Sequence, residues 1–153
     1  PNQPLARIAL VNLKTGETLG RSTINTIRAS TVVDVGQAWV AVAGQSTGTG
    51  GLVRLVRVAK NDYSDVVQGT TDVFADTMLW KFGASVYAIV PDGGSWAVGR
   101  FDPATLELKA KSAQVSRFTF LTESGGKLVA QSPGGVFLLL EAEALTTASE
   151  LKR

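Results

Sequence analysis

The stretch Val86-Tyr87-Ala88-Ile89-Val90-Pro91-Asp92-Gly93-Gly94-Ser95-Trp96-Ala97-Val98 contains two apolar segments separated by a pair of glycines. A two-residue hairpin of the primed type requires positive φ, which glycine reaches without a steric cost. The stretch therefore predicts two antiparallel strands joined by a tight turn.

The same arrangement occurs twice more, with Gly50-Gly51 before the apolar residues 52–56 and Gly134-Gly135 before residues 136–140. The second glycines of the three pairs are 43 and 41 residues apart. A period of this length indicates a repeat architecture and matches propeller blades of four strands. A short apolar strand is expected before each glycine pair, at residues 39–43, 86–90 and 128–130.

Each repeat is predicted to be a four-stranded antiparallel meander joined by short hairpins. Polar turns in one register are expected at residues 14–17, 60–62, 103–105 and 144–146. Longer strands are expected to open the units, at residues 26–34, 71–76 and 115–122. The chain is thereby divided into a half-blade at residues 5–23 and blades at about 24–69, 70–112 and 113–153. Residues 146–151 are expected to close the last blade as a strand, and a helix over residues 141–152 is the rival reading.

Length and composition indicate one globular domain without an obvious chemistry. The chain has 153 residues, of which 44% are hydrophobic and 18% charged, with a net charge of +2 and no cysteine or histidine. The small charge and the lack of a basic stripe argue against nucleic acid. Without cysteine there is no disulfide or thiol chemistry, and without histidine there is no Ser-His triad. No apolar run reaches the roughly 18 residues of a membrane span.

Residues 86–94 and 100–107, together with the similar turn at residues 9–19, resemble the blades of bacterial β-propeller repeat proteins of the YVTN and PQQ-like types. The tryptophan signature of PQQ enzymes and the Trp-Asp and Gly-His pairs of WD repeats are absent. The resemblance implies a β-propeller fold and a bacterial protein, and it carries no functional residue. An ordinary β-sandwich or barrel is the alternative fold.

The predicted strands amount to about three and a half blades, whereas closed propellers have four to eight. We therefore expect a partial propeller that is completed by an upstream segment, by another copy or by another protein. Residues 1–4 read as a linker, a mature terminus or a cut end.

Candidate binding residues lie on two kinds of element. The loops of one face carry Gln45, Ser46, Thr47 and Asp92, beside the turn at Pro133. Arg28 and Arg117 fall on predicted opening strands, which line the central channel of a propeller, and could recognise an anion there.

Two further groups have simpler explanations than a site. Asp72 and Asp76 are four residues apart on one predicted strand face and could hold a cation, although turn chemistry also explains Asp72. Trp39, Trp80 and Trp96 could stack on a ligand, but Trp39 and Trp96 head apolar strands, where core packing is the usual role. No catalytic residue, metal ligand or cofactor is predicted.

The sequence favours a non-catalytic binding or scaffold module that recognises a protein or ligand through its loops. The alternative is part of a propeller hydrolase or lyase whose site is completed outside this chain. A periplasmic or cell-surface location follows only from the resemblance and the lack of cysteine.

Overall fold

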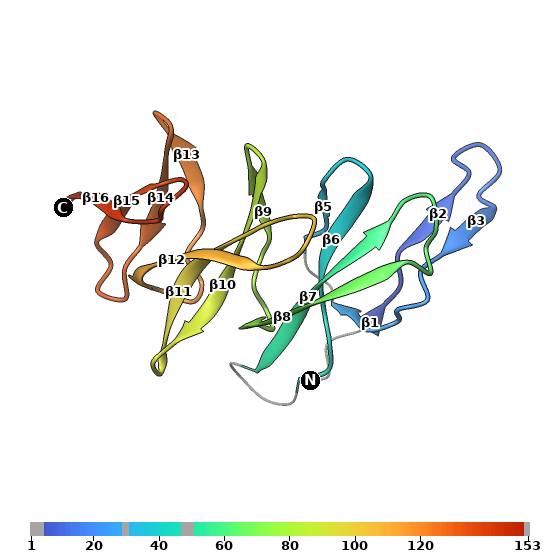
Figure 1. Cartoon of the computed structure of the whole chain (residues 1–153), viewed down its shortest axis with the longest axis horizontal. Helices are drawn as coiled ribbons and strands as arrows, with labels where there is room; N and C mark the ends of the chain where they lie inside the picture. Colours follow the sequence, from blue (N-terminus) through green and yellow to red (C-terminus); the bar gives the residue numbers. More distant parts are fainter. Residues whose placement is uncertain (1–4, 29–30, 47–50, 152–153) are drawn as a thin grey trace.

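The computed structural model describes residues 5–28, 31–46 and 51–151. These residues form sixteen β-strands, β1 to β16, and no helix (Figure 1). Every pair of hydrogen-bonded strands is antiparallel. The predicted all-β class with antiparallel sheets is therefore confirmed. Within the described ranges, no helix is both long enough and apolar enough to cross a membrane.

One hairpin and three sheets make up the fold. The N-terminal hairpin consists of β2 (Ala9–Val11) and β3 (Thr18–Arg21). The first sheet contains β1 (Leu5–Ala6), β4 (Ile27–Arg28), β5 (Val33–Asp34), β6 (Ala38–Ala43), β7 (Leu52–Ala59) and β8 (Val66–Phe74). The second contains β9 (Trp80–Phe82), β10 (Ser85–Asp92), β11 (Ser95–Phe101) and β12 (Leu108–Val115). The third contains β13 (Thr122–Ser124), β14 (Lys127–Gln131), β15 (Phe137–Glu141) and β16 (Thr147–Leu151).

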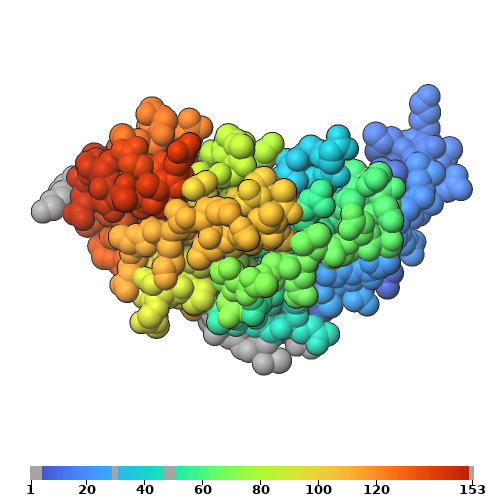
Figure 2. Space-filling model, in the orientation of Figure 1, coloured from blue at the N-terminus to red at the C-terminus, as the bar shows by residue number. Residues whose placement is uncertain are grey.

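The second and third sheets are four-stranded meanders in which each strand pairs with its neighbours in the sequence. The hairpin and the sheets lie in a row, with the hairpin at one end and the third sheet at the other (Figure 1). The space-filling view shows the N-terminal segment projecting at its end of the molecule (Figure 2). No closed barrel or propeller is identified in the described part of the chain.

Apolar side chains are buried between consecutive units of the row. One cluster joins Ile8 and Ile24, beside the N-terminal hairpin, to the first sheet. A second cluster lies between the first and second sheets, and a third between the second and third sheets. Because each unit buries its apolar side chains against its neighbours, the arrangement follows the energetics of repeat proteins.

The glycine pairs differ from one another in backbone geometry. Gly93-Gly94 has φ values of 55° and 84° and joins the paired residues Asp92 and Ser95, so the predicted primed turn is confirmed there. Of the pair Gly134-Gly135, only Gly135 has positive φ, and the pair lies in a longer loop between β14 and β15. Gly50 lies outside the described residues.

The turn before the last strand is the same in the hairpin, the second sheet and the third sheet. In the second sheet, Asp102 N donates to Glu107 O at 3.0 Å, and Leu106 N donates to Asp102 O at 2.9 Å. The equivalent pairs of bonds begin at Asn12 and at Glu141 in the other two turns.

The fifth residue of each of these turns has a left-handed backbone. It is Gly16, Leu106 or Leu145, with φ values of 74°, 59° and 57°. Both leucine side chains are only 1% exposed. Leu106 belongs to the core between the first and second sheets, and Leu145 to the core between the second and third.

The corresponding turn of the first sheet begins at Ala59, in the predicted register with Asn12 and Asp102, but it is longer than the other three turns. Ala59 N donates to Asp65 O at 3.0 Å, which leaves room for Tyr63 to reach the N-terminal hairpin. Thr23 N donates to Tyr63 O at 3.1 Å, and a Cβ on Gly20 would lie 2.9 Å from the Tyr63 ring.

The opening strands predicted at residues 71–76 and 115–122 were misplaced. Residues 71–74 belong to β8 and Val115 to β12, so both close a unit, and the next units open at β9 and β13. The segments between them are bonded to the neighbouring strand through threonine hydroxyls, which replace main-chain acceptors. These bonds run from Ile89 N to Thr77 Oγ1 at 2.8 Å and from Gln131 N to Thr119 Oγ1 at 2.7 Å.

The last segment forms the strand β16, so the strand interpretation is confirmed over the helix. The predicted strand over residues 26–34 is divided into β4 and β5, with residues 29–30 outside the described part.

Candidate interaction site

Two hollows lie where the chain passes from the second sheet to the third, and they share residues 118–120. The first has a volume of about 240 Å³ and is lined by Asp76, Met78, Trp80, Arg117, Phe118, Thr119 and Phe120. The second has a volume of about 310 Å³ and is lined by Phe118, Thr119, Phe120, Thr122, Val129, Ala130, Gln131 and Phe137. We call Phe118 to Phe120 the aromatic ridge.

The aromatic ridge exposes two phenylalanine rings because the threonine between them is fixed. Thr119 is buried, its Oγ1 accepts a bond from Gln131 N, and it donates to Phe120 O at 3.0 Å. Phe118 and Phe120 flank this anchor and remain 62% and 72% exposed. Exposed apolar clusters of this kind mark interaction sites on soluble domains.

Arg117 lies against the aromatic rings at the edge of the first hollow. Its guanidinium carbon is 4.7 Å from the centroid of Phe118 and 5.8 Å from that of Phe74. These are cation–π distances, and the half-buried Arg117 also lines the hollow. The structure therefore combines an apolar ridge with a positive charge.

Arg28, the other predicted channel residue, is buried and bonded within the fold. Its Nε donates to Ala75 O at 2.7 Å, and one terminal nitrogen donates to Gly44 O at 3.2 Å. The other terminal nitrogen lies 3.4 Å from Asp76 Oδ1. Asp76 also lines the hollow that Arg117 lines. This carboxylate is therefore paired with Arg28 and shares a hollow with Arg117.

Of the predicted loop residues, the described ones, Gln45, Ser46 and Asp92, line neither hollow. Asp92, at the tip of the β10–β11 hairpin, forms an ion pair with Lys111 at 2.6 Å. Gln45 is exposed and Ser46 is half-buried between β6 and β7. Thr47 lies outside the described residues. The binding role of these four residues remains a prediction.

The two aspartates considered as a cation site are each paired with an arginine. Asp72 lies 3.0 Å from Arg54, and Asp76 pairs with Arg28. In residues 5–28, 31–46 and 51–151, no cluster of three or more acidic, histidine or cysteine side chains could hold a metal ion.

The three tryptophans have different surroundings. Trp39 stacks on Tyr63 at 5.8 Å with Lys60 over its ring, and Trp96 packs on the buried Phe74 at 4.9 Å. Trp80 alone among them lines one of the two hollows.

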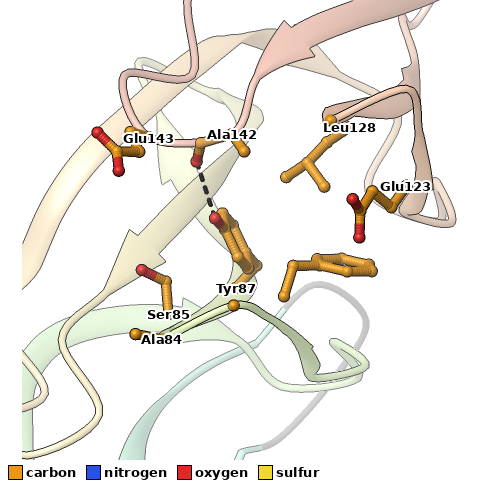
Figure 3. Close-up of a pocket in the computed structure, with 10 residues that line it drawn as sticks. Ala84, Ser85, Tyr87, Glu123, Leu128, Ala142 and Glu143 are labelled. Carbon is orange, nitrogen blue, oxygen red and sulfur yellow. Dashed lines mark hydrogen bonds between the residues drawn. The ribbon is translucent and has the colours of Figure 1, made fainter.

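A third pocket, of about 270 Å³, lies between the second and third sheets (Figure 3). Tyr87 crosses this joint and donates its hydroxyl proton to Ala142 O at 2.8 Å (Figure 3). Glu123 and Glu143 carry carboxylates at its edge. Burial, reinforced by these two carboxylates, raises the pKa of Tyr87 against the opposing effects of Ser85 and Arg100. Tyr87 therefore stays protonated and acts as a hydrogen-bond donor between the sheets.

Sequence reasoning missed the aromatic ridge and the Tyr87 joint. Residues 115–122 were expected to form one strand, in which alternate side chains would be covered. The sequence did contain a signal for the ridge, because Phe118 and Phe120 flank Thr119. The comparable segment after β8 also has an exposed apolar residue, Met78, directly after a threonine, Thr77.

The family described as "Borrelia P83/100 protein" matches residues 1–120. No curated protein matches the chain.

This match corrects the resemblance inferred from the sequence. The expected kinship with YVTN or PQQ-like propeller repeats is wrong, because the matching family is not a propeller repeat family. The local reason is visible in the turns: Asp102 Oδ1 accepts bonds from Ala104 N and Thr105 N at 2.8 and 2.9 Å. Such turns serve any antiparallel meander and do not identify a lineage. The expectation of a bacterial protein agrees with the match.

Proposed function

We propose that this chain, which belongs to the Borrelia P83/100 protein family, is a non-catalytic module. The proposed module binds a partner protein through the aromatic ridge. The observation that carries the proposal is the exposure of Phe118 and Phe120 between two hollows. Aromatic side chains and arginine supply much of the binding energy at protein interfaces.

The hollows suit the apolar side chains of a partner segment. Met78 and Trp80 line one side of the ridge, and Val129 and Phe137 line the other. Arg117 adds a positive charge at the rim, which favours a partner carrying a carboxylate near its apolar residues.

We also propose that the three sheets are successive blades around a common axis, as in a propeller. Support comes from the similar turns and from the apolar cores between consecutive sheets. This is a statement about arrangement and not about kinship. A crystal structure with the opening strands β4, β9 and β13 facing one axis would agree with it, and two sheets packed face to face as a sandwich would contradict it.

Peptides selected from a random library on the wild-type protein test the binding function. We expect selected peptides to bind the variant Phe120→Ser at least about tenfold more weakly, because the exposed ring is lost from the contact surface. Fluorescence anisotropy gives the dissociation constants. Phe120 is 72% exposed, so the free energy of unfolding of the variant should lie within about 0.5 kcal/mol of the wild-type value.

Leu13→Ser is the matched control. Leu13 is fully exposed in the N-terminal hairpin, and the substitution also replaces a large apolar side chain with serine. It should bind the peptides as the wild type does. Equal binding to Phe120→Ser and wild type would show that recognition occurs elsewhere.

A further inference from the structure

The pocket beside Tyr87 lies between two complete four-stranded sheets, so both of its walls belong to the described chain (Figure 3). The β9–β10 hairpin supplies Phe82 and Tyr87, the β13–β14 hairpin supplies Glu123, and the turn after β15 supplies Glu143. The volume of about 270 Å³ is smaller than a drug-sized ligand needs, so the pocket suits one functional group with a few carbon atoms.

The joint between the first and second sheets shows which of these side chains the repeat itself requires. The strand registers and the turns give the equivalent residues there, which are Val35 for Phe82, Val40 for Tyr87, Lys81 for Glu123 and Ala104 for Glu143. That joint packs its apolar core without an aromatic ring or a carboxylate at these positions. The aromatic and acidic side chains are therefore a property of this pocket and not a requirement of the fold.

The two carboxylates of the pocket have no opposite charge bound to them. Glu123 and Glu143 are exposed, and neither forms an ion pair with another described residue. Figure 3 shows them on either side of the Tyr87 ring. Among the described residues that line the pocket there is no lysine or arginine.

Arg100 is the cation beside this pocket, and its bonds go to neutral acceptors. Its Nε donates to Glu143 O at 2.6 Å, and a terminal nitrogen donates to Ser85 Oγ at 3.3 Å. Arg100 does not line the pocket, so the two negative charges of the lining are left to a ligand.

Aromatic rings form the apolar part of the pocket. The ring centroids of Phe82 and Tyr87 are 5.7 Å apart, and the ring planes are tilted by 56°. The faces of such rings attract a cation, and carboxylate oxygens accept hydrogen bonds from its N–H groups. A primary ammonium on a short alkyl chain supplies the charge, the donors and the apolar carbons that this lining can contact.

We propose that this pocket binds a primary alkylammonium group, with the charge between Glu123 and Glu143 and the carbon chain against Phe82 and Tyr87. The group is either the end of a lysine side chain of another protein or a free aliphatic amine. The site goes beyond the proposed function, because none of its residues lines the two hollows beside the aromatic ridge.

The probe is n-butylammonium chloride, which has the alkylammonium end of a lysine side chain, added to the ¹⁵N-labelled protein at constant ionic strength. We expect saturable shifts of the amide resonances of residues 82–87, 123–126 and 142–143, with a dissociation constant of about 10 mM or tighter. n-Butanol has the same carbon chain without the charge, so it should bind the wild-type protein at least about fivefold more weakly.

The double variant Glu123→Gln/Glu143→Gln removes the charges and keeps the size of both side chains. It should bind n-butylammonium at least about fivefold more weakly than the wild type. Glu17→Gln/Glu150→Gln is the matched control, because both of these glutamates are exposed and neither lines the pocket. The control should bind the probe as the wild type does, and both double variants should keep the wild-type urea midpoint.

The peptide acetyl-Ala-Lys-Ala-amide distinguishes the two sources of the ammonium group. Binding at least as tight as that of n-butylammonium assigns the pocket to a lysine of another protein. Weaker binding shows that a peptide backbone does not fit beside the pocket and assigns it to a free amine.

The proposal is overturned if the shifts do not saturate up to about 100 mM probe or lie only outside the pocket. It is also overturned if n-butanol binds as tightly as n-butylammonium, or if the pocket variant binds no more weakly than the matched control. Phe120→Ser should leave this binding unchanged, so failure here is distinguishable from failure of the proposed function.

Discussion

Two leucines occupy a backbone region that bulky side chains rarely enter. Leu106 and Leu145 have φ values of 59° and 57°, and such a residue costs of order 1–3 kcal/mol. Each side chain is also almost completely buried between two sheets. Burial of a leucine is worth about 2–3 kcal/mol, so the packing offsets the strain.

Leu106→Ala and Leu106→Gly should therefore rank in an unusual order. Both lose the buried side chain and should lower the free energy of unfolding by about 2–4 kcal/mol. The glycine variant should be the more stable of the two by about 1 kcal/mol, because only alanine keeps the steric cost of the left-handed backbone. Urea denaturation measures both, and a more stable alanine variant would refute the strain argument.

At the scale of a turn, Asp102 shows how a side chain fixes a backbone conformation. Its Oδ1 accepts bonds from Ala104 N and Thr105 N. The bond from Thr105 N, followed by that from Ala104 N, lowers the pKa of Asp102 below its ordinary value. Asn12 makes the same pair of bonds, to Lys14 N and Thr15 N, in the N-terminal hairpin without a charge.

This lowered pKa predicts a pH dependence. A carboxyl group whose pKa is lower in the folded state adds stability above its unfolded pKa of about 3.9, and the contribution is lost as the pH falls through the folded pKa. The wild type should therefore lose stability below about pH 4. Asp102→Asn should lose less over the same range, because the amide keeps the turn and does not titrate.

Urea midpoints of both proteins at pH 7, 5 and 3 check this expectation. Asp34 and Asp62 also have lowered pKa values, so the variant should retain part of the wild-type dependence. Identical pH profiles would contradict a contribution from Asp102.

The sequence predicts an element correctly where local chemistry allows a single backbone conformation. The prediction fails where a tertiary hydrogen bond determines the conformation. Gly93-Gly94 admits a primed hairpin, and the structure has one. Residues 116–121 have the apolar alternation of a strand, yet the hydroxyl of Thr119 takes the main-chain acceptor's place and turns Phe118 and Phe120 outward. That bond joins Thr119 to Gln131 of β14, so the apolar alternation alone does not report it.

Across the whole molecule, the sheets are joined by side chains as well as by apolar cores. Tyr87 of the second sheet donates to the carbonyl of Ala142, which follows β15 in the third. Tyr87→Phe should lower the free energy of unfolding by about 0.5–1.5 kcal/mol, because the phenylalanine ring fits but the hydrogen bond is lost.

Tyr63→Phe is the control for this change. The Tyr63 ring stacks on Trp39, and its hydroxyl makes no hydrogen bond within the described residues. Its unfolding free energy should stay within about 0.5 kcal/mol of the wild type. A loss in Tyr63→Phe equal to that in Tyr87→Phe would mean that the bond between the sheets contributes nothing.

The large-scale organisation was only partly accessible from the sequence. The period of the glycine pairs indicated repeated meanders, because turns of the same kind recur at the same place in successive meanders. The family was misjudged for the same reason, since turns such as Asp102 to Glu107 arise from local hydrogen bonds in unrelated proteins. The hydrogen bond of Tyr87 forms only when the second and third sheets are packed together. The sequence of neither sheet alone therefore predicts it.

The buried leucines also impose an order on synthesis at the ribosome. The first sheet is complete once Phe74 has emerged, but the leucine that packs against its far face, Leu106, lies beyond β11. The second sheet waits in the same way for Leu145, beyond β15. A nascent chain therefore exposes the apolar face of its newest sheet until the following unit is translated, and that face is what a chaperone meets first.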